Sequence, residues 1–357
     1  MLLNNEMKKT TILLGAGAMI PFGGPTTQEL TQRLMLNKIC KTSLSSIYNW
    51  KNKEANFEFL LSSIENILDW KLANEDNSIN LVNSNLLVEP IFQYRFTLLR
   101  DIWDIYCEAI NEIIERVREY DLYTSSCPEK LSSLANFVIS KSKTSDLKIY
   151  SLNYDRLIPQ IIKGSGVCFY EGFNDRCCEY DIAKFVNCHN TYFNLHGSIY
   201  YSYISEGRVK LDDIPMNLDH RYYIDGGNPG EKKVFLPIIA GYSKSQRIMC
   251  EPFNFGLATF MNDCNTCDRL VIVGYSFGDP HINSILNRFV RHDTTDIQII
   301  DYFIGEKIPD NIRAIPYLGF GISQAMFIKD SNNYYLDKQP NVKAYFNGFE
   351  QYINDNM

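Results

Sequence analysis

The feature that most constrains the fold of this chain is a strand, a glycine turn and a helix start near the N-terminus. Thr10–Leu14 is a short β-branched and apolar run, which is typical of a buried parallel strand. A glycine-rich turn follows over residues 15–24, and Thr26 with Glu29 three residues later predicts a capping box. These elements in this order suit a pyrophosphate, because backbone N–H groups and the helix dipole both face the anion.

Later segments predict the rest of a sheet. Helical patterns separate them, with an N-cap at Asp279 followed by Pro280, and a closing amphipathic helix is expected from Val342 to Ile353. Short buried strands alternating with helices predict an α/β fold with a doubly wound, Rossmann-like parallel sheet. The further strands are expected at 148–152, 191–195, 234–239, 270–273 and 297–300.

One long helical stretch interrupts this alternation. Apolar residues recur there at helical spacing, as at Phe57, Leu60 and Leu61, which predicts a helical insertion after the first strand unit. Its residues indicate no function beyond packing. The expected domains are a discontinuous sheet domain of residues 1–44 and 142–310, the helical insertion of residues 45–141, and a C-terminal segment of residues 311–357 packed on the core.

Composition and charge exclude several classes of protein. With 45% hydrophobic and 22% charged residues, the chain is neither disordered nor a coiled-coil rod. A net charge of −7 argues against a broad nucleic-acid footprint, so no direct nucleic-acid binding is expected. The first ten residues are polar, and no apolar run approaches the roughly 20 residues that cross a bilayer. We therefore expect a cytoplasmic protein without membrane contact.

The ten cysteines predict reduced thiols rather than a metal site. Cys264 and Cys267 form a lone CxxC pair, with no second pair at the spacing of a zinc ribbon. A structural zinc site needs four ligands, so no metal is expected.

Polar residues follow three of the predicted strands. Asn153 and Asp155 come directly after the strand at 148–152, His196 follows the next strand, and Gly274 and Ser276 follow the strand at 270–273. Ligands of open α/β sheets bind beyond the carboxyl ends of the strands, so these residues are expected to converge on one crevice.

An ordinary dinucleotide-binding dehydrogenase is not favoured by the glycine turn. The GxGxxG fingerprint begun by Gly15 and Gly17 requires a glycine at position 20, where this chain has Ile20. The turn by itself therefore indicates a phosphate-bearing ligand without saying which one.

Taken in order, these segments resemble the SIR2 (sirtuin-like) family, in particular the bacterial SIR2-like NAD hydrolases of antiphage defence. The resemblance covers most of the chain, and a helical insertion after the first unit is also similar to that branch. It is carried by Gly15–Ala18, Phe22–Thr27, Leu30–Thr31, Ser151–Asp155, Leu195–Ser198 and Val273–Asn283.

The resemblance implies NAD⁺ as the substrate and a role for each matching residue. Asn153 and His196 would be catalytic: the amide would orient a ribose hydroxyl or the attacking water, and the imidazole, with an ordinary pKa near 6.5, would accept its proton. The implied NAD-binding residues are Gly15, Ala16, Gly17 and Ala18 at the pyrophosphate, Asp155 at the nicotinamide ribose, Gly274 and Ser276 on the adenosine side, and Asp301 at the adenine or its ribose.

Three departures from the sirtuin deacetylases argue against protein deacetylation. Met19 stands where those enzymes carry a serine, and Pro21–Pro25 occupies the place of their Asp-Phe-Arg segment. The zinc ribbon that frames their peptide cleft is missing. Water is therefore the expected acceptor of the ADP-ribosyl group.

The function expected from the resemblance is an NAD⁺ glycohydrolase that releases nicotinamide and ADP-ribose as the effector of an antiphage, abortive-infection system. Because the chain leaves no segment for sensing, the expected partner is a HerA-type ATPase, an Argonaute-type module or a nucleotide-processing subunit, and a homo-oligomer is expected. Two alternatives stay open. One is a transferase or cyclase acting on NAD⁺, and the other is a non-catalytic subunit that binds NAD⁺ or ADP-ribose.

Overall fold

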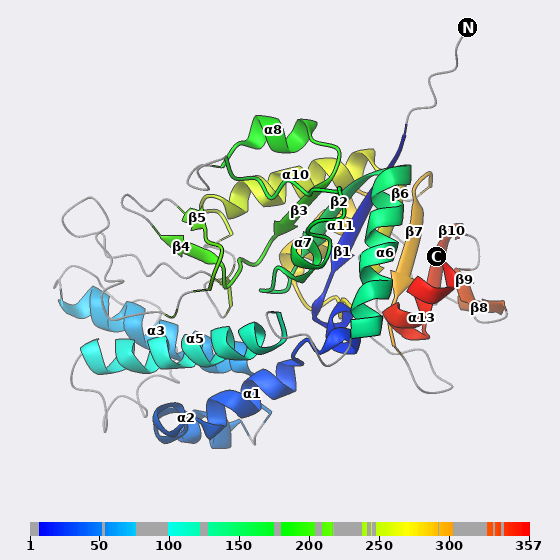
Figure 1. Cartoon of the computed structure of the whole chain (residues 1–357). Coiled ribbons are helices and arrows are strands. Elements are labelled where there is room, and N and C mark those ends of the chain that lie inside the picture. The colour runs from blue at the N-terminus through cyan, green and yellow to red at the C-terminus, as the bar shows by residue number, and fades with distance from the viewer. Residues whose placement is uncertain are drawn as a thin grey trace, which may run out of the picture.

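The computed structural model has at its centre an eight-stranded sheet with the order β3-β2-β1-β6-β7-β10-β9-β8 (Figure 1). The strands of this sheet are β1 (Lys8–Leu14), β2 (Ser145–Ser151), β3 (Thr191–Asn194), β6 (Arg269–Val273), β7 (Asp296–Ile300), β8 (Phe327–Asp330), β9 (Asn333–Leu336) and β10 (Gln339–Tyr345). The structure describes residues 7–51, 54–75, 99–121, 128–174, 180–203, 209–215, 217, 238–240, 244, 248–291, 293–302, 327–330, 333–336 and 339–357.

The first six strands of this order are parallel to one another, and the pairs β10–β9 and β9–β8 are antiparallel, so that β9 runs opposite to the others. Numbered by their order along the chain, the six parallel strands read 3-2-1-4-5-6 across the sheet. This is the doubly wound order of a Rossmann-like fold, so the predicted fold class is confirmed. The direction of winding reverses between β1 and β6, which are adjacent and in register from Thr10 opposite Arg269 to Leu14 opposite Val273.

Helices cover both faces of the sheet. The helices are α1 (Thr27–Leu36), α2 (Lys38–Trp50), α3 (Phe57–Glu75), α5 (Leu99–Asp121), α6 (Pro128–Thr144), α7 (Leu157–Ile161), α8 (Ile182–Asn187), α10 (Phe253–Thr266), α11 (Pro280–Phe289) and α13 (Gly348–Asp355), with short 3-10 turns at η1 (Ala16–Ala18) and η2 (Ile20–Phe22). A hairpin of β4 (Tyr201–Tyr203) and β5 (Val209–Leu211) lies outside the main sheet.

The alternation of side chains along β1 assigns its residues to two cores. Leu13 packs with buried residues of α10 and α11 on one face, whereas Ile12 and Leu14 pack on the other. That second core runs without interruption from the sheet through α6 and α13 into helices α1, α2, α3 and α5. The helices of the expected insertion therefore share a hydrophobic core with the sheet.

The helices at the two expected boundaries of the helical insertion continue across those boundaries. Helix α2 spans the expected boundary at residue 45, and α6 spans the expected boundary at residue 141 and packs against α13 and the sheet. Figure 1 shows α1, α2, α3 and α5 gathered beyond the carboxyl end of the strands. A buried hydrogen bond of 2.9 Å from the Phe57 N–H to the Thr31 hydroxyl joins α3 to α1.

Sequence patterns located most of the strands. The runs at 148–152, 191–195, 270–273 and 297–300 correspond to β2, β3, β6 and β7. Of the run at 234–239, residues 234–237 lie outside the described residues, and Ile238 forms an isolated bridge to Gly197.

The predicted closing helix was wrong over its first residues. Val342 and Ala344 are buried and Lys343 between them is exposed, a period of two that belongs to strand β10. The helix itself, α13, begins at Gly348.

None of the helices in the described part of the chain is long and apolar enough to cross a membrane. None of the seven described cysteines is in a disulfide. Cys264 and Cys267 are both buried, and burial raises the pKa of the Cys267 thiol to about 11. These two cysteines are therefore packed as apolar side chains.

Candidate active site

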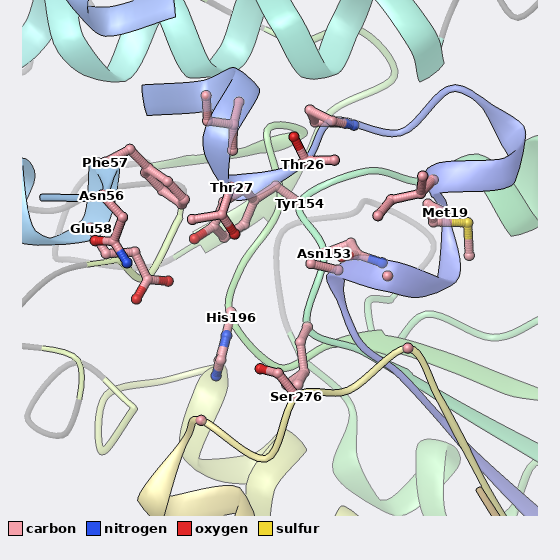
Figure 2. A pocket seen from close by; sticks show the side chains of 18 of the residues that line it. Met19, Thr26, Thr27, Asn56, Phe57, Glu58, Asn153, Tyr154, His196 and Ser276 are labelled. Atoms are coloured by element: carbon pink, nitrogen blue, oxygen red, sulfur yellow. The ribbon is translucent and has the colours of Figure 1, made fainter. Parts of the chain in front are cut away.

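A cavity of about 630 Å³ lies at the carboxyl ends of the central strands, where the winding of the sheet reverses. This is the position at which open α/β sheets bind ligands. Figure 2 shows side chains from the glycine turn, from α1, from α3 and from the loops after β2, β3 and β6 around one hollow. Of the ten residues that the sequence singled out, eight line this cavity: Ala16, Gly17, Asn153, Asp155, His196, Gly274, Ser276 and Asp301.

The glycine turn after β1 is packed backbone to backbone against the turn after β6. The Gly15 N–H donates to the Val273 carbonyl at 2.8 Å, and the Gly17 N–H donates to the Gly274 carbonyl at 2.9 Å. A Cβ on Gly15 would lie 2.4 Å from the Gly274 oxygen, and a Cβ on Gly274 would lie 2.2 Å from the Ala18 nitrogen. The glycines are therefore required by the contact between the two turns.

This contact uses backbone N–H groups of the glycine turn that were expected to bind a pyrophosphate. The N–H groups of Gly15, Gly17 and Ala18 all donate to carbonyls of the protein, so these three do not serve an anion. Gly15 and Ala18 do not line the cavity, whereas Ala16 and Gly17 do. The expected pyrophosphate contact is thus confined to part of the turn.

Helix α1 supplies the end of the cavity next to the glycine turn. The predicted capping box is confirmed: the Glu29 N–H donates to the Thr26 hydroxyl at 3.1 Å, and the Thr26 N–H donates to the Glu29 carboxylate at 2.7 Å. Thr27 and Gln28, in the first turn of the helix, line the cavity. The positive end of the helix dipole therefore faces the space in which a ligand would lie.

Asn153 projects from the loop after β2 and has a fixed orientation. Its Nδ2 donates to the Gly15 carbonyl at 3.1 Å. Because a carbonyl oxygen only accepts, the amide nitrogen must face it, and no described residue donates to Oδ1. Oδ1 is thereby left as a hydrogen-bond acceptor for a ligand.

The same loop is braced by Asn194, a residue that was not among the predicted site residues. Its Nδ2 donates to the carbonyls of Asn153 at 2.8 Å and Asp155 at 2.9 Å. An amide as the last residue of a buried strand is the sequence signal that could have identified it.

Asp155 lines the cavity but is almost wholly buried, and its carboxylate accepts from the Leu157 N–H at 3.0 Å. Burial raises the pKa of Asp155. Burial, together with the charge of Asp155, also raises the pKa of the neighbouring Asp121 to about 8. The Asp121 carboxylate accepts from the Arg156 N–H at 3.0 Å and so connects the end of α5 to the loop after β2.

His196 follows β3 and is 2% exposed. Its Nε2 lies 3.0 Å from the Nε2 of His281, which belongs to the first turn of α11. Burial, then the Lys244 ammonium and His281, lower the pKa of His196 well below 6.5. The imidazole is therefore neutral at physiological pH, as a general base must be.

Lys244 joins the two sides of the cavity. Its ammonium lies 2.7 Å from an Asp279 carboxylate oxygen and 3.1 Å from a Glu58 carboxylate oxygen of α3. Burial acts to lower the pKa of Lys244, but the two carboxylates outweigh it and raise the pKa. Lys244 thus holds a fixed positive charge beside His196. Neither Lys244 nor Glu58 belongs to a sequence motif, so the sequence analysis did not predict them as site residues.

Another part of the cavity lining comes from the loops after β6 and β7. Gly274 has a left-handed backbone, φ +55°, and its N–H donates to the Ile300 carbonyl at 2.8 Å. Ser276 and Asp301 line the cavity here, and burial raises the pKa of Asp301. Gly274, Ser276 and Asp301, the residues expected on the adenosine side, therefore all line the same cavity.

Helices α3 and α5 form a wall of the same cavity. Asn56, Phe57 and Glu58 line it at the start of α3, and Val117 and Tyr120 line it near the end of α5. The helical segment, for which the sequence indicated only packing, therefore contributes directly to the candidate site.

Within the described residues, one group could offer three ligand atoms to a metal ion: His196, Asp279 and His281, with atoms within 4.8 Å of one another. The Lys244 ammonium already lies 2.7 Å from the Asp279 carboxylate. A fixed cation beside the donor atoms opposes a second cation, so the charges at this point do not favour a metal.

No protein-family model matches this chain, and no curated protein matches it. Among solved structures, it is similar to a triple mutant of a Sir2 homologue in complex with 2′-O-acetyl ADP ribose. The sequence identity is 14% and the TM-score is 0.37, over 82% of this chain and 80% of that one.

Proposed function

We propose that this chain is an NAD⁺ glycohydrolase, which cleaves NAD⁺ to nicotinamide and ADP-ribose. One observation carries the proposal: a single cavity holds an amide whose Oδ1 is left for a ligand, at Asn153, and a buried histidine held neutral, at His196. The cavity volume of about 630 Å³ falls within the usual range for small-molecule sites. The Rossmann-like strand order and the resemblance to SIR2-like proteins support NAD⁺ as the ligand.

The proposed reaction breaks the bond between nicotinamide and C1′ of the ribose. Positive charge develops on the ribose as nicotinamide leaves, and a water oxygen then bonds to C1′. His196 accepts the proton that this water loses, and Oδ1 of Asn153 accepts a hydrogen bond from the water or from a ribose hydroxyl. No metal and no protein nucleophile takes part.

The two halves of NAD⁺ would lie against different parts of the cavity lining. The nicotinamide ribose would lie near Asn153 and His196, and the adenosine near Ser276 and Asp301. The pyrophosphate between them would lie against Gly17 and the first turn of α1, where the helix dipole favours negative charge.

The test is incubation of the purified chain with NAD⁺ and chromatography of the products. Nicotinamide and linear ADP-ribose are expected, and Asn153→Ala and His196→Ala should each lower the rate by about 100-fold or more. Exposed Asn262 and His189 serve as controls, because their alanine variants remove the same groups outside the cavity. Cyclic ADP-ribose, or transfer to an added acceptor, would instead indicate a cyclase or transferase.

We also propose that the activity serves antiphage defence and is gated by a partner chain, with homo-oligomerisation. The resemblance to the defence branch supports this role. The assay is therefore repeated with the product of the neighbouring gene, and cellular NAD⁺ is measured during phage infection. If neither condition lowers NAD⁺, and the Asn153 and His196 variants behave as the wild type, the proposed function fails.

A further inference from the structure

The geometry around His196 points to a second functional histidine, His281. We propose that His281 is a positioning residue that accepts a hydrogen bond from Nε2–H of His196 and thereby keeps the Nδ1 lone pair of His196 available to the substrate. This inference rests on the proposed function, in which His196 is the base. No part of the proposed reaction described above uses His281.

The first observation is the contact between the two rings. The Nε2 atoms are 3.0 Å apart, and the ring planes are inclined by 50° with centroids 5.2 Å apart. At this separation one nitrogen must donate and the other must accept, because two lone pairs or two N–H groups would repel each other. The contact therefore couples the tautomer of one ring to the tautomer of the other.

The second point is that the surroundings of both rings favour the neutral form. Burial and the Lys244 ammonium lower the pKa of His196, and burial lowers the pKa of His281 to about 4, with Asp279 opposing the change and Lys244 adding to it. The charged groups next to the pair are Lys244 and Asp279, with Glu58 on the far side of Lys244. Each neutral ring carries one proton, so the pair has only two arrangements that form the hydrogen bond.

The two histidines have different positions relative to the cavity, which gives them different roles. His196 lines the cavity, whereas His281 is half-buried on α11 and does not line it. Since Nε2 of His196 faces His281, only Nδ1 of His196 remains for a ligand. To act as a base there, Nδ1 must carry no proton, which requires the proton on Nε2 and an acceptor facing it.

The arrangement that serves His196 as a base gives His281 the role of acceptor. A carboxylate oxygen of Asp279 lies within 4.8 Å of a ring nitrogen of each histidine. When His281 carries its proton on Nδ1, its Nε2 is the acceptor that His196 requires. When His196 takes up a proton at Nδ1, it becomes an imidazolium whose Nε2–H bond to His281 strengthens.

The direct test is nitrogen NMR of protein labelled with ¹⁵N-histidine, because Nδ1 and Nε2 shifts distinguish the two neutral tautomers. The chain has five histidines, and the His196→Gln and His281→Gln variants assign the two signals. We expect Nε2–H for His196 and Nδ1–H for His281. The inference is wrong if the two histidines show the opposite tautomers. It is also wrong if added zinc shifts the signals of both histidines and the cleavage of NAD⁺ depends on zinc.

Kinetics supplies a second test with two matched variants. In His281→Gln an amide oxygen can replace the acceptor, and the variant should keep kcat within about 3-fold of the wild type. In His281→Leu no acceptor remains, and kcat should fall about 10- to 100-fold with little change in KM. If His281→Leu keeps full kcat, or if both variants lose it equally, the positioning role is wrong.

The two proposals can fail separately. If the His196 tautomer is as expected but no NAD⁺ is cleaved under any condition, the proposed function fails while the hydrogen-bond assignment stands. If NAD⁺ is cleaved and His196→Ala abolishes cleavage but His281→Leu does not, only the inference about His281 fails.

Discussion

The two ends of the cavity are built in different ways. At the glycine end, the turns after β1 and β6 meet through backbone atoms, with no room for a side chain between Gly17 and Gly274. At the histidine end, charged and titratable side chains meet: Lys244 with Asp279 and Glu58, and His196 with His281. The first end depends on shape and the second on the positions of protons and charges.

This difference predicts how each end responds to substitution. A contact between two backbones cannot relax around an added atom, so a change at the glycine end should act on folding. A change in charge at the histidine end should leave the fold and move the pH dependence of catalysis. The predictions below run from the largest expected effect to the smallest.

The largest effect is expected for Gly274→Ala. The added Cβ would lie 2.2 Å from the Ala18 nitrogen and 2.3 Å from the Gly17 carbonyl carbon, at a left-handed φ of +55°. We expect a loss of more than about 3 kcal/mol in the free energy of unfolding, or failure to fold. Thermal denaturation of the soluble fraction measures it.

Two control variants separate the causes of that loss. Gly164 has φ +87° with nothing within 4 Å, so Gly164→Ala should cost only about 1–2 kcal/mol of strain. A Cβ on Gly278 makes an ordinary contact of 3.4 Å, so Gly278→Ala should be nearly neutral for folding. Equal losses for Gly274→Ala and Gly164→Ala would contradict the steric account.

The next effect is expected for Lys244→Met. Glu58 and Asp279 lose their cation, which should cost about 1–3 kcal/mol, since both carboxylates keep some contact with water. The pKa of His196 should rise because a nearby positive charge is gone. A base must be neutral, so the acid limb of kcat/KM against pH should move to higher pH.

The control for this change is Lys130→Met, which removes an exposed ion pair of 2.7 Å with Glu350. It should leave both stability and the pH profile almost unchanged. An acid limb that stays in place in Lys244→Met, with the protein folded, would show that Lys244 does not act on the base.

A smaller effect is expected for Asp121→Asn. The folded pKa of about 8 lies above the ordinary value of 3.8, so the folded state resists ionisation and loses stability as pH rises between these values. Asparagine removes that loss. The variant should exceed the wild type in stability at pH 8 by about 1–2 kcal/mol, roughly 1–3 °C in Tm, and the gain should shrink toward pH 4.

Differential scanning calorimetry at pH 5 and pH 8 checks this prediction. The exposed Asp293 gives the control, because Asp293→Asn should change Tm equally at both pH values. A gain for Asp121→Asn that is the same at both pH values would point to a cause other than ionisation.

The smallest effect is expected from a chelator. The Lys244 ammonium occupies one side of the Asp279 carboxylate, so the histidine end should work without a metal ion. EDTA followed by gel filtration should leave the NAD⁺-cleaving rate within about 2-fold. Loss of activity that zinc restores would reverse this conclusion and place a metal between the histidines.

The glycine end was the part that the sequence predicted best. A strand, a glycine turn and a capped helix are local features, and the Thr26–Glu29 capping box is formed by residues three apart. What local patterns could not provide is the partner of the turn. Gly15 and Gly274 have no room for a side chain because they touch each other. They touch because β1 lies beside β6, which comes about 250 residues later in the chain.

At the histidine end, the sequence located the loops but not their surroundings. The rule that ligands bind beyond the carboxyl ends of parallel strands was sufficient to collect Asn153 and His196, whose catalytic roles stay predictions. Lys244 and Glu58 were not found, because a single lysine or a helix-start glutamate has no pattern that distinguishes it from a solvated charge. Their importance arises only from contacts across the tertiary structure.

The same limit explains the error at the C-terminus. Residues 342–346 include enough apolar positions to satisfy either a helix or a strand period over so short a length. Pairing of β10 with β7 and β9 decides between them. The domain boundaries expected at residues 45 and 141 stay predictions as well.

The central place of β1 also determines when the site can exist during protein synthesis. Strand β1 pairs with β6, and the cavity is lined by residues from Ala16 to Asp301. At about 5–20 residues per second, a ribosome needs roughly 10–50 s after β1 to make β6. A nascent chain therefore has no complete cavity until Asp301 has been synthesised.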